Sequence, residues 1–371
     1  MLELLLGRSG TGKTHTVFDE LTRLAEQDEG LPLYLLVPEQ FSFESEKNLL
    51  RRLGPQRASR VQVLSFTRLA QTVFRELGGV AGKRMDDAAR ALLMSQAVHG
   101  VSDQLTLYRR QVADPDYMEA VVSFVSECKQ CAISPLLLTE TSAALEEGSL
   151  KQKTQELALI YGAYEALVAQ TEQIDPLDDL GTLSHILPES RLFYGSKIYV
   201  DGFKGFTAQE MQILTVLLRQ AETMVVALCT DTIAADEAGT DRFTPAIRTA
   251  AHLRDLAREH HIPVAKVRLL TDNRRSADPA LRALEENVFL PVPVTYEGET
   301  AAVTVVPCSD PAAECRFAAR TVRRLLRENG GRCRDFTVVV RSLDDYQTLL
   351  ESAFEQEELP CTIDRRDSIL T

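Results

Sequence analysis

The segment LELLLGRSGTGKT, residues 2–14, decides the fold of this 371-residue chain. Its apolar start, residues 2–6, predicts a short buried strand, and a helix is expected from Thr14 to about Ala25. Between them, residues 7–14 match the phosphate-loop pattern G-x-x-x-x-G-K-[ST], whose glycines let backbone N–H groups face a phosphate. Lys13 would reach the β- and γ-phosphates, and the Thr14 hydroxyl would bind Mg²⁺. The expected nucleotide-binding residues are Gly7, Arg8, Ser9, Gly10, Thr11, Gly12, Lys13 and Thr14.

Strands and helices continue to alternate after this loop. Thr207 and Glu210 form a capping-box pattern at the start of one of these helices. The alternation predicts an α/β fold with a parallel sheet flanked by helices. Apolar runs predict strands at 33–37, 61–64, 197–201, 224–229 and 264–269, and helices are predicted at 43–52, 67–77, 207–219 and 244–260.

Residues 86–187 break that alternation. They show helical periodicity and no convincing strand, with the clearest helices at 88–99, 117–128 and 155–171. A second α/β unit follows, with strands predicted at 303–306, 336–340 and 361–363 and helices at 312–328 and 344–355. Because this unit is too small for a complete doubly wound domain, we expect the chain to be the N-terminal piece of a longer protein. We predict a nucleotide-binding domain from 1–80 and 190–298, a helical insertion at 81–189, and a truncated second domain at 299–371.

The overall composition is that of an ordinary globular protein, with 44% hydrophobic and 26% charged residues. No apolar run approaches the roughly 20 residues of a membrane span, and the N-terminus has no signal-peptide pattern. The seven cysteines show no disulfide-like spacing, so we expect a cytoplasmic protein with no membrane partner. A net charge of −13 argues against a basic coat for nucleic acid but leaves room for a local DNA groove.

A phosphate loop needs a second, acidic element. Asp201 ends a predicted strand, where its carboxylate is placed to hold Mg²⁺ through a water. In a hydrolysing enzyme the next residue is commonly Glu, which orients the attacking water. Here the next residue is Gly202, and Glu210 lies a turn into the following helix. Nucleotide binding is therefore better supported than hydrolysis, and an ordinary acid at a strand end is the alternative interpretation.

Polar side chains also follow two other predicted strands. Glu39 and Gln40 follow the second strand, at the sheet edge where open α/β folds bind ligands; a polar loop is the alternative. Ser65, Phe66 and Arg68 follow the third strand, and a hydroxyl, an aromatic ring and a guanidinium suit a single-stranded backbone and base. The alternative for Phe66 is a place in the core.

Three further patterns bear on possible sites. Arg341 ends a predicted strand in the second α/β unit, from which a cation could reach a γ-phosphate across an interdomain cleft; a solvated arginine is the alternative. The lone C-x-x-C of Cys128 and Cys131 has no second pair at metal spacing, so zinc is not expected. No Ser/His/Asp or Cys/His nucleophile pattern is present in the sequence.

In order along the chain, these motifs resemble those of superfamily 1 helicases. The loop at 7–14 resembles motif I, and VLSFTRLA at 63–70 resembles the DNA-contacting element after the third strand. Val200-Asp201 resembles motif II, and residues 338–341 resemble motif IV. The wording is closer still to the AddB family, the B subunits of AddAB helicase–nucleases. Four segments of this chain are similar to motifs of that family, and they occur in the same order over essentially the whole chain. They are GRSGTGKT, LVPEQFSFESE, YVDGFKGFTAQE and VVVRSLDDY.

The resemblance implies a RecA-like parallel sheet with an all-helical insertion and the start of a second RecA-like domain. It implies ATP and Mg²⁺ as ligands, DNA and an AddA-type subunit as partners, and an iron–sulfur nuclease domain that belongs to the full-length protein rather than to this piece. It implies an ATP-dependent helicase/exonuclease complex for double-strand break repair. In that complex this half keeps the phosphate loop, loses motor function and takes part in recognising the Chi sequence.

By this resemblance the chain alone would have little or no ATPase activity and no nuclease activity. Two other hypotheses remain open at this point. One is an active superfamily 1 motor, which the missing Glu after Asp201 argues against. The other is an interaction module whose phosphate loop is vestigial.

Overall fold

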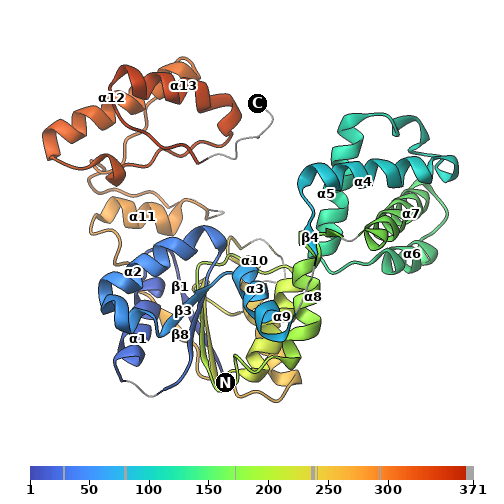
Figure 1. Cartoon of the computed structure of the whole chain (residues 1–371). Helices are drawn as coiled ribbons and strands as arrows, with labels where there is room; N and C mark the ends of the chain where they lie inside the picture. Colours follow the sequence, from blue (N-terminus) through green and yellow to red (C-terminus); the bar gives the residue numbers. More distant parts are fainter. Residues whose placement is uncertain are drawn as a thin grey trace. The chain divides into compact units, whose positions relative to one another are not determined.

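The computed structural model describes residues 1–27, 30–78, 82–171, 173–234, 239, 241–290, 292 and 294–364. The chain divides into two units, Met1–Val294 and Thr295–Thr371. Within its described residues the first unit holds a six-stranded parallel sheet (Figure 1), which confirms the predicted α/β fold. The strand order is β3 (Val61–Leu64), β2 (Leu33–Leu36), β6 (Lys197–Val200), β7 (Thr223–Cys229), β1 (Leu2–Gly7) and β8 (Arg268–Leu270).

Helices cover both faces of this sheet, which explains why its strands are mostly apolar and buried. One face packs against α1 (Lys13–Gln27) and α2 (Glu39–Ala58). The other face packs against α3 (Phe66–Leu77), α8 (Asp179–Ile186), α9 (Ala208–Gln220) and α10 (Thr244–Glu259) (Figure 1). The alternation of β1 follows from this: Leu4 and Leu6 enter the second core, and Leu5 enters the first.

Two predicted elements have different bounds in the structure. The strand predicted at 264–269 is shorter, because β8 pairs with β1 only near Leu5 and Leu6, and Val264 forms just an isolated bridge with Leu2. The helix predicted at 43–52 instead begins at Glu39 and runs to Ala58, with a break at Gly54, whose φ is +71°. The capping box of Thr207 and Glu210 at the start of α9 is confirmed.

The predicted helical insertion contains α4 (Asp87–Gly100), α5 (Pro115–Gln130), α6 (Pro135–Ala144) and α7 (Ser149–Gln170). Helices α4, α5 and α7 share a hydrophobic core of their own, with Met94, Val125 and Tyr164 among its buried residues. The prediction of no strand between 86 and 187 is wrong at one place. Here β5 (Gln173–Ile174) pairs with β4 (Lys83–Arg84), because the two chain segments that lead into and out of the helices run side by side. The predicted boundary at 80–81 lies outside the described residues.

A buried ion network fastens these helices together. The Lys129 side chain is 3% exposed, and its Nζ lies 2.9 Å from Glu165, 3.1 Å from Asp175 and 2.6 Å from Asp178. The Asp175 carboxylate is fully buried and also accepts a 2.8 Å hydrogen bond from the Tyr164 hydroxyl. Burial opposes the charge on Lys129, but the three carboxylates outweigh it and raise its pKa.

The second unit is built on α12 (Pro311–Asn329) and α13 (Leu343–Gln356), which pack through Cys315, Ala319 and Phe354. Both helices agree with the prediction. The strands predicted at 303–306, 336–340 and 361–363 are absent from the structure: none of these described segments pairs with a neighbour. An apolar segment forms a stable strand only where it pairs with another strand and buries its side chains. Here Val305 is 89% exposed and Val339 is 86% exposed.

Among the described residues, no single helix is long and apolar enough to cross a membrane. Helices α5 and α6 reach the required length and composition only when taken together, and they are bent by 95° at their junction.

Candidate functional site

The phosphate loop has the predicted strand–loop–helix form, with β1 ending at Gly7 and α1 beginning at Lys13. Gly10 and Gly12 have φ values of +83° and +92°, a region that favours glycine. A Cβ on Gly7 would lie 2.3 Å from Thr11 Oγ1 and 2.9 Å from the Leu270 carbonyl oxygen, so no side chain fits there. The backbone of the loop therefore depends on all three glycines.

The Lys13 ammonium lies back on this loop. Its Nζ donates hydrogen bonds to the carbonyl oxygens of Gly7 at 2.7 Å and Arg8 at 2.9 Å. Burial lowers the pKa of Lys13, an effect that nearby Asp201 opposes. A partly buried cation whose direct partners are neutral carbonyls gains from an incoming anion, and a phosphate oxygen would supply that charge.

Asp201 lies directly after β6 and is 6% exposed. Burial raises the pKa of Asp201, while a side-chain hydrogen bond from Thr14, the Gly202 N–H and the charge of Lys13 hold it down. The structure thus brings together the predicted pair, the Thr14 hydroxyl and the Asp201 carboxylate, beside the end of the loop. Such oxygen donors are the kind that Mg²⁺ prefers, and they fit a cation that also binds a nucleotide phosphate.

The residue after Asp201 has a backbone suited to glycine. Gly202 has a φ of +84°, and a Cβ there would lie 3.3 Å from Pro38 Cδ and 3.4 Å from Phe41 Cδ2. A glutamate at this position would therefore be strained in its backbone and tight against the start of α2. Position 202 therefore lacks the carboxylate that would orient water, and its backbone conformation also disfavours any residue that could supply one.

The segment after β8 covers the phosphate loop, a feature the sequence analysis missed. The Arg274 N–H donates a 2.8 Å hydrogen bond to the Gly10 carbonyl, and the Arg275 guanidinium donates one of 3.2 Å to Ser9 Oγ. Asn273 orders this turn, because its Oδ1 accepts from the N–H groups of residues 275 and 276. The only signal in the sequence is an arginine pair that follows a predicted strand, about 260 residues from the loop it meets.

Arg8 is bound to neighbouring protein groups. Its Nε lies 3.1 Å from a carboxylate oxygen of Glu285 in α11 (Pro279–Asn287), and its Nη2 donates to the Glu285 carbonyl oxygen at 2.8 Å. Its Nη1 lies 3.6 Å from Asp231. Arg8 therefore ties the loop to α11. Two other guanidinium groups lie against the loop: that of Arg275 at Ser9, and that of Arg274, whose Nη1 is 3.9 Å from where a Cβ on Gly12 would lie. Arg341 is exposed in the second unit, and its approach to a nucleotide stays a prediction.

The residues predicted to touch DNA differ in exposure. Ser65 caps α3, accepting the Arg68 N–H at 3.2 Å, and Phe66 is 6% exposed with its ring against Phe203 and Phe206. Phe66 therefore belongs to the core in this conformation, which is the alternative interpretation given above. Arg68 remains partly exposed and forms an ion pair with Glu46 of α2.

Glu39 and Gln40 are exposed in the first turn of α2 rather than in a loop. Beyond them lie two exposed aromatic rings that the sequence analysis did not single out. Phe41 is 47% exposed and Phe43 is 70% exposed, with the Lys47 ammonium 5.7 Å from the centre of the Phe43 ring. These rings are the exposed aromatic surface at this sheet edge that a base could stack on.

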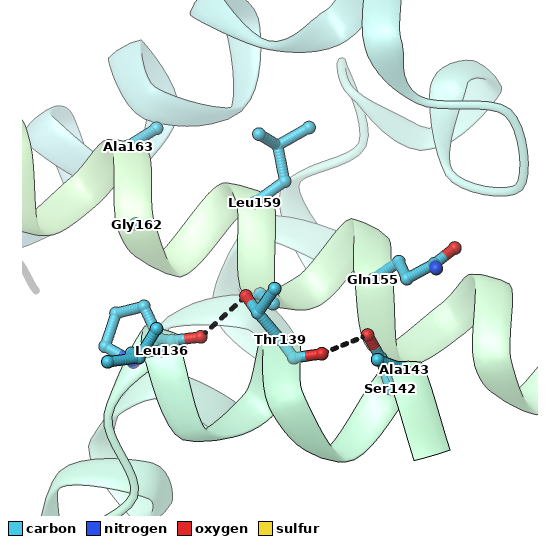
Figure 2. Close-up of a pocket in the computed structure, with 10 residues that line it drawn as sticks. Leu136, Thr139, Ser142, Ala143, Gln155, Leu159, Gly162 and Ala163 are labelled. Carbon is cyan, nitrogen blue, oxygen red and sulfur yellow. Dashed lines mark hydrogen bonds between the residues drawn. The ribbon is translucent and has the colours of Figure 1, made fainter. Parts of the chain in front are cut away.

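A separate hollow of about 580 Å³ lies between α6 and α7 (Figure 2). The two helices meet near Gly162, where a Cβ would lie 3.8 Å from Pro135 Cβ, an ordinary van der Waals contact. The hydroxyls of Thr139 and Ser142 donate to backbone carbonyls of their own helix, at 2.9 and 2.7 Å, so their protons are already used within the helix (Figure 2). The lining residues carry no charge, and the hollow does not suit a phosphate compound.

Metal ligation by cysteine finds no support in the part of the chain that the structure describes. No group of three His, Cys, Asp or Glu side chains there is placed to hold a metal ion. Of the C-x-x-C pair, Cys128 is buried and Cys131 is exposed. The oxygen donors that the structure brings together at the phosphate loop are the Thr14 hydroxyl and the Asp201 carboxylate.

Comparison with known proteins gives a consistent result. Residues 4–285 match the family model described as "ADDB, N-terminal". Similar relatives are named as the B subunits of ATP-dependent helicase/deoxyribonucleases. The one from Acetivibrio thermocellus is 32% identical over 100% of this chain and 32% of its own length. The one from Desulforudis audaxviator is 35% identical over 98% of this chain and 32% of its own length. The chain thus spans about a third of the length of these relatives, and it belongs to the AddB family.

Proposed function

We propose that this chain binds Mg-ATP at its phosphate loop, as the helicase-like part of a helicase/nuclease subunit that acts in double-strand break repair. The observation that carries the proposal is the convergence of Lys13, Thr14 and Asp201 beside a loop with the backbone of a phosphate site. Thr14 and Asp201 would hold Mg²⁺, and the ion would neutralise phosphate charge. Lys13 and Arg275 would bind phosphate oxygens by charge-assisted hydrogen bonds.

We propose further that the bound ATP is hydrolysed slowly or not at all. The support is Gly202, which carries no carboxylate and whose conformation disfavours a side chain. ATP would then stabilise the sheet edge or regulate the complex rather than drive a motor. If the isolated chain hydrolysed ATP continuously, and Lys13→Ala abolished that hydrolysis, the alternative of an active motor would be favoured.

The proposal extends to DNA and to a partner. The carboxyl ends of β2, β3 and β6 lie next to one another in the sheet and present Glu39, Gln40, Phe43 and Arg68 at one edge. We infer that a single strand of DNA crosses this edge, with a base stacked on Phe43. The relatives are named as B subunits, which supports a complex with a second, AddA-type subunit that carries the working motor. A role in recognising Chi would follow from that assembly.

Calorimetric titration of Mg-ATP into the chain tests the nucleotide part. Lys13→Ala should weaken binding at least tenfold, because it removes a charge-assisted contact to phosphate. Lys151→Ala is the matched control, since the ion pair that Lys151 forms within the described part of the chain is with the exposed Glu147. If the unaltered chain binds no Mg-ATP, or binds it equally well after Lys13→Ala, the loop is vestigial and the interaction-module hypothesis replaces this one.

The DNA part is tested by the anisotropy of a labelled single-stranded oligonucleotide. Phe43→Ala should weaken binding by roughly fivefold or more, the effect of losing one stacked base. Phe289→Ala is the control, because Phe289 is 73% exposed, close to the 70% of Phe43, but lies after α11. Equal effects of the two substitutions would remove DNA from this edge of the sheet.

A further inference from the structure

Helix α12 of the second unit carries a row of five arginines. They recur at intervals of three and four residues, so at 3.6 residues per turn their side chains occupy an arc of about 100° on one side of the helix. Against them the helix has only Glu314 and Glu328, in a chain whose net charge is −13. We call this feature the arginine row: Arg316, Arg320, Arg323, Arg324 and Arg327.

Four of the five line a hollow of about 680 Å³, together with Glu328 and Glu357. The end of α13 orders two of them. Arg320 lies 3.3 Å from the Glu357 carboxylate, and Arg323 donates to the Glu357 carbonyl oxygen at 2.6 Å. Arg324 and Arg327 form no ion pair within the described part of the chain. Arg323 also lies 3.8 Å from the Glu358 carboxylate. Four guanidinium groups thus face three carboxylates, those of Glu328, Glu357 and Glu358, and the hollow keeps an excess of one positive charge.

We propose that the arginine row binds the phosphate backbone of a single DNA strand, as a second contact surface outside the sheet edge. Arg316 to Arg327 span about 16 Å along the helix, a length over which several successive phosphates of a single strand can be contacted. Every cation after Lys266 in the chain is arginine, the side chain whose planar fork binds phosphate bidentately. An acidic polypeptide is the competing class of partner.

An exposed aromatic ring favours nucleic acid over an acidic polypeptide. Phe317 is 44% exposed on α12, beside the arginine row, three residues before Arg320 and seven before Arg324. A cationic track with an aromatic ring at its border is the combination that binds single strands, since phosphates meet the guanidinium groups and a base stacks on the ring. The assignment of the arginine row to nucleic acid does not depend on the proposed function; the choice of DNA as that nucleic acid does.

The test is anisotropy of a labelled oligothymidylate of about 15 nucleotides, titrated with the full chain in salt between about 50 and 200 mM. Arg324→Gln with Arg327→Gln should reduce the slope of log K against log salt by about 1.4, at 0.7 for each lost contact to a single strand. The unaltered chain should then lose about sevenfold more affinity than this variant across that fourfold rise in salt. Phe317→Ala should weaken binding about fivefold and leave the slope unchanged.

The matched control is Arg109→Gln with Arg258→Gln, which removes two positive charges from side chains that are 64% and 73% exposed in the first unit. A slope reduced equally by both pairs would mean that net charge alone acts, and would overturn the proposal. So would polyglutamate that displaces the oligonucleotide as well as unlabelled oligothymidylate does, because the row would then be an acidic-peptide site. If the arginine variant fails to fold, as circular dichroism would reveal, Phe317→Ala and the polyglutamate competition still decide. The effect of Phe43→Ala on oligonucleotide affinity is measured separately. It reports on DNA binding at the sheet edge, whereas the arginine variant reports on the arginine row, so either proposal can fail without the other.

Discussion

Replacing Gly202 with glutamate supplies the carboxylate that commonly follows the motif aspartate in hydrolysing enzymes, yet we expect it to create no ATP turnover. The reason lies in the backbone. Gly202 has a φ of +84°, and its amide N–H is hydrogen-bonded to the Asp201 carboxylate. A side chain at this position must either keep that strained conformation or rotate the backbone, which would move Asp201 away from Thr14.

The structure sets the size of the effect. A left-handed conformation costs an L residue about 1–2 kcal/mol. The new Cβ would also lie 3.3 Å from Pro38 Cδ and 3.4 Å from Phe41 Cδ2, contacts that require shifts of a few tenths of an ångström. Small shifts of Pro38 and Phe41 would relieve most of this crowding, so the backbone strain remains the larger part of the cost. We expect Gly202→Glu to destabilise the β6 region by about 2 kcal/mol in total.

Hydrogen exchange followed by mass spectrometry measures this locally. A loss of about 2 kcal/mol should speed exchange in peptides from β6 and α9 by about 30-fold. Gly30→Ala is the control, because Gly30 has a φ of +70° and the described residues place nothing within 4 Å of where its Cβ would lie, so it reports backbone strain alone. ATP turnover by Gly202→Glu, dependent on Lys13 and accompanied by exchange like that of the unaltered chain, would refute the reasoning.

Three further outcomes follow from the same structure. Lys129→Met should leave Asp175 buried without its main counter-charge and destabilise the helical part by about 3 kcal/mol, seen as exchange about 160-fold faster in α5 and α7. Lys151→Met, whose partner Glu147 is 90% exposed, should change exchange less than about threefold; similar effects of the two would contradict the network. Arg275→Ala should weaken Mg-ATP binding roughly tenfold in calorimetry, and an unchanged affinity would remove Arg275 from the site. Burial raises the pKa of the Cys128 thiol to about 11, so iodoacetamide at about pH 8 should label Cys131 and spare Cys128. Equal labelling of both thiols in the folded chain would show that Cys128 is accessible.

The local part of the site could be predicted because its signals are short in range. A phosphate loop is specified by glycines and a lysine within eight residues, and the strand before it by an apolar run. Asp201 could be found for the same reason, since a carboxylate at the end of a buried strand lies at the sheet edge where ligands bind. In each case neighbours in the sequence fix the geometry, and the sheet then places the pieces.

The remainder depends on distant contacts. Nothing near Arg275 in the sequence shows that it meets Ser9, because the contact exists only once β8 has paired beside β1. The aromatic residues show the same limit: Phe66 and Phe43 both lie near helix starts, yet Phe66 packs into an aromatic cluster and Phe43 is exposed. Which ring a base could reach is decided by helix packing, which a single sequence does not display.

These observations separate phosphate binding from hydrolysis in physical terms. The groups that would bind phosphate and Mg²⁺ depend on side chains and glycines that the fold holds in place, with Lys13 on the loop carbonyls and Thr14 on Asp201. The group that would orient water is missing at a position where the backbone itself resists a side chain. Placing a carboxylate there would thus require rebuilding the turn that leads from β6 toward α9 and the start of α2 that lies against it, with several compensating changes rather than one. We therefore expect nucleotide affinity and turnover to respond separately to mutation, because the groups that would bind phosphate and Mg²⁺ are the side chains of Lys13, Thr14 and Asp201, whereas Gly202 contributes backbone alone.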